Sequence, residues 1–329
     1  MRKLLLLLLL MLSLHSDDKY RLGEGVQVGS LPFYVGGYFS LDYIKKEGET
    51  KYSIDDVAIL GYGNYSKFSY MVELEYKEPY SYTDRGSQTY TEKDSHLYTE
   101  RLYVDYNHDE NFMFRAGKYN SNIGFWNLLP INVLRETTSS PKSTYIIFPK
   151  FTTGLDSSYT SYEDGGLKIN ATLQHNDSID NDDYNNYEVD KHYGAGLSYE
   201  MNEYTFKING GYFHTDYNIK KEDLYYLLLS AKYEADNYQI LTEFGSQKSQ
   251  EEYTTKYAGY IQGVYRFTQS HIGVLRAESY DNKRDNISEE IMVVGYTYRP
   301  LYPIALKSEY QFHSKEDDNK LLFSLSVLF

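Results

Sequence analysis

Apolar and polar residues alternate along most of this chain in short blocks. In the segment 204–209, Tyr, Phe and Ile alternate with Thr, Lys and Asn. Because successive side chains of a β-strand point to opposite faces, such a block predicts a strand with one apolar and one polar face. Each block also has about the length of a tilted transmembrane strand, roughly 9–11 residues. The blocks lie at residues 33–44, 54–65, 68–76, 98–106, 112–119, 151–161, 166–175, 192–201, 204–214, 224–235, 237–247, 256–267, 271–281, 290–298, 304–313 and 321–329.

The links between these blocks alternate in length. The tight links are 64–66, 107–111, 162–165, 202–203, 236, 268–270 and 299–303. The longer links are 45–53, 79–94, 120–150, 176–191, 215–223, 248–255, 282–288 and 314–320. An even number of strands with short turns at one end and long loops at the other is typical of single-chain barrels in bacterial outer membranes. We therefore predict an all-β fold, a transmembrane antiparallel β-barrel of about 16 strands over residues 32–329.

The beginning of the chain differs from the rest. A short basic head is followed by an unbroken apolar run at 4–12 and then by a small-residue exit that ends at Ser16. This run is shorter than the roughly 20 residues that a spanning helix needs, and it is typical of a secretory signal peptide. We predict a signal peptide at 1–16, cleaved near Ser16, and a short periplasmic N-terminal segment at 17–31.

Composition agrees with a barrel. The chain has 39 Tyr, 15 Phe, one Trp and no Cys, with a net charge of −14. Its mean hydropathy is −0.60. This low value is compatible with a barrel, because the polar residues of the inward strand faces and the loops lower the average and offset the apolar residues that face lipid. The tyrosines near strand ends are expected to form interfacial girdles. The absence of Cys excludes disulfides, thiolate metal sites and thiol nucleophiles.

Several segments resemble known bacterial envelope proteins. The last block, 321–329, ends in Phe329 and resembles the closing strand of outer-membrane β-barrel proteins. The stretches 101–106, 114–118, 123–124, 134–141 and 153–155 are similar to the middle of outer-membrane porins, distantly those of the phosphate-selective group. The resemblance implies passive diffusion through a pore in the outer membrane, contact with lipid and lipopolysaccharide, and a homotrimer. It does not extend to phosphate specificity, because the chain lacks a long ladder of arginines.

The longest link, 120–150, is the first candidate for function. Loops of about 30 residues are uncommon and are usually functional. This third long loop is rich in Ile, Phe, Leu and its single Trp126, which suits packing against a barrel wall. We expect it to fold into the lumen and form a constriction. The alternative is an external loop that caps a neighbouring subunit or meets lipopolysaccharide.

Charged residues of this loop and of the inward strand faces define the expected constriction. A basic ring would favour anions, including phosphate. The inward-facing acids are as numerous as the bases, however, so a transverse field without strong selectivity is equally compatible with the sequence. The candidates for the pore constriction are Arg101, Arg115, Lys118, Arg135, Glu136, Lys142, Glu73 and Asp105.

Other functions find less support in the sequence. The loop 176–191 is rich in Asp, but its spacing is not that of an EF-hand and a solvated loop is the better interpretation. The eight His residues are dispersed, no Gly-x-Ser-x-Gly occurs, and no glycine-rich phosphate loop or basic nucleic-acid patch is present. We therefore predict a porin for small hydrophilic solutes or ions, without enzymatic activity, cofactor, metal or nucleic-acid partner. The alternatives are a closed structural or adhesive barrel and, second, an outer-membrane hydrolase.

Overall fold

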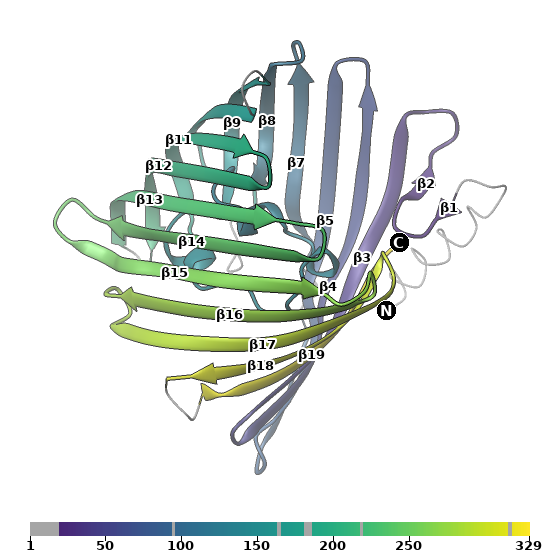
Figure 1. Ribbon diagram of the computed structural model, residues 1–329, viewed down its shortest axis with the longest axis vertical. Helices are drawn as coiled ribbons and strands as arrows, with labels where there is room; N and C mark the ends of the chain where they lie inside the picture. The colour runs from purple at the N-terminus through teal and green to yellow at the C-terminus, as the bar shows by residue number, and fades with distance from the viewer. Residues whose placement is uncertain (1–19, 94–95, 163–165, 181–185, 218–219, 315–317) are drawn as a thin grey trace.

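A closed wall of antiparallel strands makes up almost the whole molecule (Figure 1). The computed structural model describes residues 20–93, 96–162, 166–180, 186–217, 220–314 and 318–329. In this part of the chain, sixteen strands form the wall, and each pairs with its neighbours along the chain, which confirms the predicted fold. They are β3 (Phe33–Lys46), β4 (Glu49–Tyr65), β5 (Phe68–Asp84), β7 (Tyr98–Asn107), β8 (Phe112–Asn120), β9 (Phe151–Ser161), β10 (Gly166–His175), β11 (Val189–Met201), β12 (Tyr204–Tyr217), β13 (Lys220–Glu234), β14 (Tyr238–Lys248), β15 (Tyr253–Arg266), β16 (His271–Asn282), β17 (Ile287–Leu301), β18 (Ile304–His313) and β19 (Lys320–Leu328).

The wall closes between its last and first strands. β19 pairs with β3 in a register that runs from Lys320 opposite Lys46 to Leu328 opposite Tyr38. Phe329 and Gly37 then exchange two backbone hydrogen bonds of 2.7 Å each. A Cβ atom at Gly37 would lie 2.4 Å from a backbone oxygen of β4 and 2.8 Å from the Phe329 ring, so this seam requires glycine. Closure leaves no unpaired edge in the wall, as a membrane-spanning sheet requires.

Within the described residues, three short strands lie outside the wall. β1 (Tyr20–Arg21) pairs with β2 (Gly25–Gln27), and β2 pairs with β3 where Val26 lies opposite Val35. β6 (Thr89–Glu92) pairs with the far end of β5. Residues 20–27 of the predicted periplasmic segment therefore contact the barrel, while the predicted signal peptide at 1–16 lies outside the described residues.

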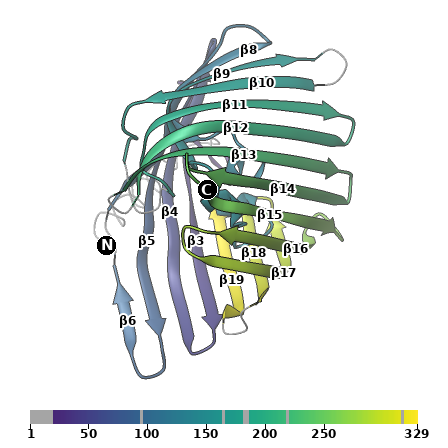
Figure 2. The same ribbon diagram turned by 90° about the vertical axis from the view of Figure 1, so that its left-hand side faces the viewer.

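Several links are shorter than the alternation pattern suggests. The link predicted at 45–53 consists of residues 47–48 alone, because β3 and β4 continue as a paired hairpin. The links expected at 248–255 and 282–288 shrink in the same way to 249–252 and 283–286. Figure 2 shows the paired ends of β3, β4, β5 and β6 projecting beyond most of the other strands. Beyond the apolar belt, backbone pairing continues without any need for alternation, so the sequence pattern ends before the strand does.

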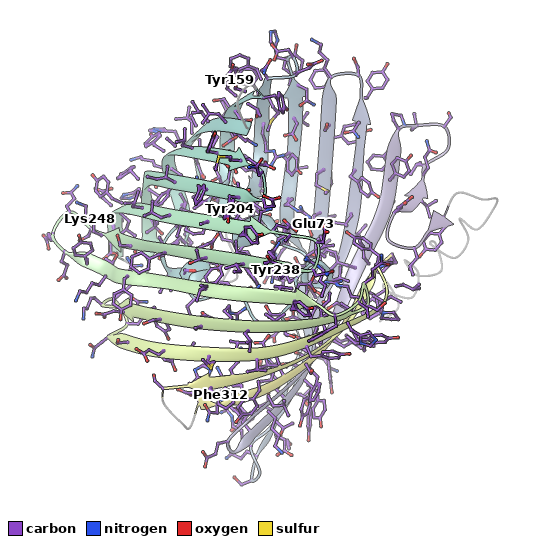
Figure 3. The ribbon with its side chains drawn as sticks, in the orientation of Figure 1. Glu73, Tyr159, Tyr204, Tyr238, Lys248 and Phe312 are labelled. Atoms are coloured by element: carbon purple, nitrogen blue, oxygen red, sulfur yellow. The ribbon has the colours of Figure 1, made fainter. Side chains whose placement is uncertain are left out.

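Inward and outward faces follow the predicted alternation (Figure 3). On β12, Tyr204, Phe206 and Ile208 are exposed, whereas Asn209 is buried. On β5, Glu73 and Glu75 are buried inside the barrel although both are acids. Polar and charged groups therefore fill the interior, and apolar groups cover the outside. This is the arrangement of a barrel surrounded by lipid.

Short helical structure occurs in the loop between β8 and β9. It comprises η1 (Trp126–Leu128), η2 (Asn132–Leu134) and α2 (Ser143–Ile146). No helix within the described ranges has the length and apolar character needed to cross a membrane.

Candidate functional site

The segment 121–150 between β8 and β9 folds into the barrel, as predicted; we call it the lumen loop. Its base is closed by a hydrogen bond of 2.9 Å from the Ser121 amide to the Lys150 carbonyl oxygen. The Asn127 side-chain amide donates to the same two residues' carbonyl oxygens at 2.8 and 3.0 Å. The loop therefore leaves the wall and returns to it at one narrow neck.

The lumen loop first meets the opposite wall at Gly124. This residue has a φ of +66°, and a Cβ atom there would lie 2.5 Å from the Glu243 carboxylate, so the turn requires glycine. The Gly124 amide donates to the Asn209 side chain at 3.1 Å. The next two amides, of Phe125 and Trp126, both donate to the Glu243 carboxylate. A buried acid on β14 thus holds the first turn of the loop.

Arg276 on β16 holds the middle of the loop. Its guanidinium donates to Thr137 Oγ1 at 3.0 Å, to the Ser139 carbonyl oxygen at 3.1 Å and to Ser139 Oγ at 2.6 Å. It also bonds Glu278 at 2.7 Å and lies 5.5 Å from the centre of the Trp126 ring. The Arg276 side chain has no exposed surface. Because an unpaired buried charge is costly, these partners fix the loop and the guanidinium together.

Three further wall residues bind loop backbone or side-chain groups. Glu309 on β18 accepts from the amides of residues 138 and 139 at 3.0 and 3.2 Å. Lys307 donates to the Asn132 side chain at 2.7 Å. Arg299 donates to the Val133 carbonyl oxygen at 2.6 Å and forms an ion pair of 3.1 Å with Glu136. The inward charges of β17 and β18 are therefore largely engaged by the loop.

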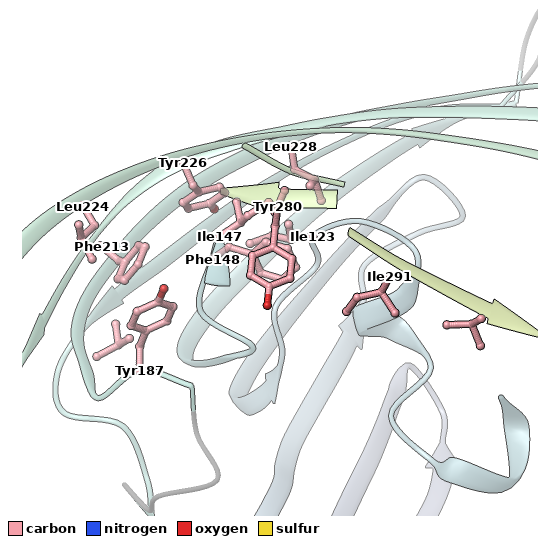
Figure 4. Close-up of a cluster of buried hydrophobic side chains, with 13 residues drawn as sticks. Ile123, Ile147, Phe148, Tyr187, Phe213, Leu224, Tyr226, Leu228, Tyr280 and Ile291 are labelled. Carbon is pink, nitrogen blue, oxygen red and sulfur yellow. The ribbon is translucent and has the colours of Figure 1, made fainter. Parts of the chain in front are cut away.

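Apolar side chains of the loop pack against the inside of the wall. Ile123, Ile147 and Phe148 are buried in one cluster with inward residues of neighbouring strands (Figure 4). The other members are Tyr187, Val189, Phe213, Leu224, Tyr226, Leu228, Ala258, Tyr280, Ile291 and Val293. The same region is secured by hydrogen bonds from Gln247 to the Ile147 carbonyl oxygen, 2.8 Å, and from Thr255 to that of residue 146, 3.0 Å. The lumen is therefore filled by packed side chains next to these strands.

Four of the predicted constriction residues form two ion pairs within the wall. Arg101 of β7 bonds Glu73 of β5, its cross-strand partner in the register. Arg115 of β8 bonds both carboxylate oxygens of Asp105 at 2.6 and 2.8 Å, and these residues are also register partners. The sequence predicted that all four face the lumen, but not that each base neutralises an adjacent acid.

The other four predicted residues have separate surroundings. Lys118 is buried and donates to the Asp180 carbonyl oxygen at 3.1 Å. Arg135 bonds loop carbonyl oxygens at residues 129 and 130, both at 2.7 Å, and Glu136 pairs with Arg299 as described above. Lys142 donates its backbone amide to Glu278 at 2.9 Å, while its side chain is exposed. The structure therefore does not assemble all eight residues into one ring.

An acidic part of the wall faces the loop. Asp55 and Asp56 on β4 lie close enough to Arg135 to interact electrostatically with it. Tyr145 of α2 is also near Asp55, and 40% of its surface is exposed although it lies inside the barrel. Burial raises the pKa of Tyr145, but interactions with Lys150, Arg135 and Ser140 together outweigh this effect and lower the pKa overall. Opposite charges thus meet at the face of the loop that remains in contact with water.

The acidic loop before β11 contributes a local anchor. A carboxylate oxygen of Asp180 accepts from the Thr99 amide at 2.7 Å, and hydrogen bonding to Thr99 lowers the pKa of Asp180. Asp182 and Asp183 of the same loop lie outside the described residues. Within the described ranges, no group of three or more acid or His side chains is arranged to hold a metal ion.

Sequence reasoning missed Arg276 as a site residue. The sequence could have predicted that Arg276 faces the lumen. Its neighbours Leu275 and Ala277 face outward, so strand alternation places Arg276 on the inward face. Its partners at residues 137 and 139 are separated from it by more than 130 positions, so no local pattern predicts the contact.

Comparison with known proteins gives a match at the level of fold. No protein-family model and no curated protein sequence matches this chain. Among solved structures, the outer-membrane channel DcaP of Acinetobacter baumannii has a TM-score of 0.60 at 11% identity, covering 93% of this chain and 100% of that one. OmpF of Salmonella typhi, in complex with daunomycin, has a TM-score of 0.63 at 13% identity, covering 90% and 97%. The anion-selective porin from Comamonas acidovorans has a TM-score of 0.61 at 11% identity, covering 90% and 99%.

The chain therefore has the fold of outer-membrane porins, a class of closed sixteen-stranded barrels. At these identities the likeness concerns the fold alone. The distant resemblance to the phosphate-selective group stays a prediction.

Proposed function

We propose that the protein is an outer-membrane porin that lets small hydrophilic solutes or ions diffuse passively through a water-filled pore. One observation carries the proposal: a closed barrel with a polar interior contains a loop whose apolar side chains pack against the wall. The opposite face of the loop keeps Lys142 and Tyr145 exposed inside the barrel. The solute gradient would drive transport, and the protein would supply pore width and charge.

The outer surface supports a position in a lipid bilayer. Large apolar side chains on every wall strand are exposed, among them Tyr159, Tyr204, Tyr238 and Phe312, which Figure 3 labels. Aromatic residues near strand ends suit the two membrane interfaces. The end with the turns 66–67, 202–203 and 302–303 would face the periplasm, and the end with the neck of the lumen loop would face the outside.

Charge selectivity would arise between the loop and the acidic wall. Arg135, Lys142 and Lys150 give the loop three bases, and Asp55 and Asp56 lie on the facing strand β4. Bases on one side and acids on the other produce a field across the passage, and they favour neither sign of ion as strongly as a ring of one charge does. We therefore propose a modest selectivity that single charge changes can shift.

Planar-bilayer recording of the refolded protein tests this function. Discrete conductance steps are expected, with a reversal potential in a salt gradient that reports the dominant ion. Lys142→Gln removes a positive charge from the lumen and should shift the reversal potential towards cations. Lys248→Gln removes the same charge from an exposed position at the far end of β14 and should leave it unchanged. Equal shifts in both variants would refute the assignment of Lys142 to the passage.

A closed structural barrel is the alternative, and the apolar cluster of the lumen loop favours it. Thirteen buried residues of the described chain fill part of the interior, which a wide diffusion pore does not require. The same recordings distinguish the two functions. Insertion of folded protein without conductance would support a closed barrel whose external loops act in adhesion.

An outer-membrane hydrolase has weaker support. Hydrolysis by a nucleophile needs a base that contacts both the nucleophile and an orienting acid. His313 contacts Glu289 at 2.8 Å, but its other ring nitrogen contacts Gln311 at 3.0 Å. His192 is bound between Thr152 and Tyr226, both at 2.9 Å. A broad esterase and protease screen should therefore be negative, and turnover that depends on one of these histidines would overturn the proposal.

We also propose a homotrimer in contact with lipid and lipopolysaccharide. One of the similar solved structures is OmpT of Vibrio cholerae in a trimer form, with a TM-score of 0.58 at 10% identity. Cross-linking and an unheated gel should show a trimer. A monomer band that persists after cross-linking would count against it.

A further inference from the structure

A series of hydrogen bonds follows the inward face of β18 to the lumen loop. His313, Gln311 and Glu309 are alternate residues of this strand, and all three are buried. The His313 ring contacts the Gln311 amide at 3.0 Å, and that amide contacts Glu309 at 2.7 Å. Glu309 also accepts from the loop backbone at residues 138 and 139 and from the Ser139 hydroxyl. We call the three residues of β18 the β18 relay.

The direction of each hydrogen bond in the β18 relay follows from Glu309. This residue accepts from two amides, from a hydroxyl and from Gln311, which fills the roughly four acceptor positions of an ionised carboxylate. Because a carboxylate only accepts, the Gln311 side chain turns its NH2 group towards Glu309 and its Oε1 atom towards His313. Oε1 is an acceptor as well, so His313 Nε2 carries a hydrogen atom.

The other ring nitrogen of His313 also faces an acceptor. Nδ1 lies 2.8 Å from a carboxylate oxygen of Glu289 on β17. The second oxygen of Glu289 accepts from the Tyr280 hydroxyl at 2.6 Å. Both ring nitrogens of His313 therefore donate, and a histidine that donates from both is a charged imidazolium. Its side chain is only 4% exposed, so this charge depends on its partner Glu289.

Other charged groups surround the pair of His313 and Glu289. Lys142 of the lumen loop and Lys320 of β19 are close enough to Glu289 to interact electrostatically with it. Asp318, which precedes β19, interacts in the same way with Lys320. Two acids and two lysines thus lie around the ring. Histidine is the side chain among these groups that ordinarily changes its charge between about pH 5 and 8.

From this geometry we infer that His313 is a positioning residue, which docks the lumen loop firmly only while its ring holds both protons. A ring with one proton turns a lone pair towards either Glu289 or Gln311, and one hydrogen bond is lost. If the Gln311 amide rotates to restore its bond to His313, its oxygen atom faces Glu309 instead. Each alternative removes a hydrogen bond from the β18 relay, so deprotonation weakens the hold of Glu309 on the loop. The inference rests on the proposed pore and adds control by protons to it.

Trp126 can report on this docking, because Arg276 connects it to the β18 relay. Ser139 Oγ donates to Glu309 and accepts from Arg276 at 2.6 Å. The Arg276 guanidinium lies 5.5 Å from the centre of the Trp126 ring. Urea should release the loop from the wall, and Trp126 emission follows that release. Its midpoint, measured where an unheated gel shows a folded barrel, reports how firmly the loop is docked.

The urea midpoint should fall as the pH rises from about 5 to 8. Losing one hydrogen bond to a charged group should lower the ratio of docked to undocked loop about tenfold. His313→Gln and Gln311→Leu should both make the midpoint independent of pH, because the first cannot titrate and the second separates His313 from Glu309. His271→Gln is the matched control and should keep the fall, because His271 is exposed at the start of β16, at the other end of the barrel.

The outcomes separate the β18 relay from the pore. A midpoint that is independent of pH in the unmodified protein, or a fall that persists in His313→Gln or Gln311→Leu, overturns the inference. A fall with pH in a protein without conductance steps supports the inference on the loop and overturns the proposed pore alone.

Nitrogen NMR of the unmodified protein decides the question if the variants fold poorly. Both ring nitrogens of His313 should be protonated at about pH 5, and one should have lost its proton by about pH 8. A ring that is already neutral at about pH 5 overturns the inference.

Discussion

Arg276→Met is expected to release the lumen loop while the barrel stays closed. Arg276 makes three hydrogen bonds to residues 137 and 139 of the loop and one to Glu278. Methionine fills a similar volume but donates no hydrogen bond. The substitution leaves the wall intact, because the backbone hydrogen bonds of β16 to β15 and β17 do not involve this side chain. The loss therefore concerns the docking of the loop.

The size of the effect follows from burial. The Arg276 side chain is fully buried, and the Glu278 side chain is 4% exposed. Removing one partner of a buried ion pair costs about 3–5 kcal/mol, because the other charge stays without compensation. A change of about 4 kcal/mol lowers the ratio of docked to undocked loop by roughly a thousandfold. The remaining anchors at Glu243 and Glu309 oppose complete release.

The single tryptophan reports on this equilibrium. Trp126 lies in the loop, is 2% exposed and contacts Tyr260 with ring centres 6.2 Å apart. In Arg276→Met, its emission should move to longer wavelength and acrylamide should quench it more strongly. Arg85→Met is the matched control, because Arg85 is exposed on the projecting hairpin and its side chain contacts Glu49 and the Tyr90 ring there. An unheated gel verifies that both variants retain the compact barrel.

Unchanged Trp126 emission and quenching in Arg276→Met, with the barrel intact, would refute the reasoning. It would mean that the apolar cluster and the backbone contacts hold the loop without the guanidinium. A shift of equal size in Arg85→Met would refute it as well, because the contacts of that side chain among the described residues are with Glu49 and Tyr90 and not with the loop.

Two further predictions concern the seam and a loop anchor. Gly37→Val should prevent closure between β3 and β19, since a Cβ atom at this position meets backbone 2.4 Å away. The refolded protein should then lack the heat-dependent gel shift, whereas Gly263→Val, at an open position of the wall, should retain it. Hydrogen bonding to Thr99 lowers the pKa of Asp180, so stability from this contact is present above the unfolded value of about 3.9 and is lost as pH falls through the lower folded value. Carboxyl carbon shifts measured by NMR should show Asp180 titrating below a control aspartate, and a normal midpoint would contradict the contact.

The sequence predicts the wall well because the wall is periodic. Each inward strand face, such as the one that carries Lys307 and Glu309, follows directly from alternation with outward apolar residues. Strand ends were predicted less well: β4 begins at Glu49 rather than at residue 54, because paired backbone continues into water where alternation no longer matters.

Pairing between side chains is harder to predict than their direction. Alternation predicts that Arg101 and Glu73 both face the lumen, but their contact depends on the register between β7 and β5. A shift of register by two residues preserves every face and changes every partner. The path of the lumen loop is harder still, because it has no periodicity, and its anchors on β14, β16 and β18 are distant in the chain.

The charge of −14 overstates the negative character of the lumen. Glu243 and Glu309 accept amides of the loop, and Glu278 binds Arg276, so these buried acids hold structure and are not available to attract solute ions. Charged groups that keep access to water are fewer, and the exposed Lys142 in the loop is one of them. Ions respond most strongly to charges that neither a partner nor a packed core shields. Selectivity should therefore depend on this small accessible set, and changes among the structural acids should alter the docking of the loop before they alter the sign of the selected ion.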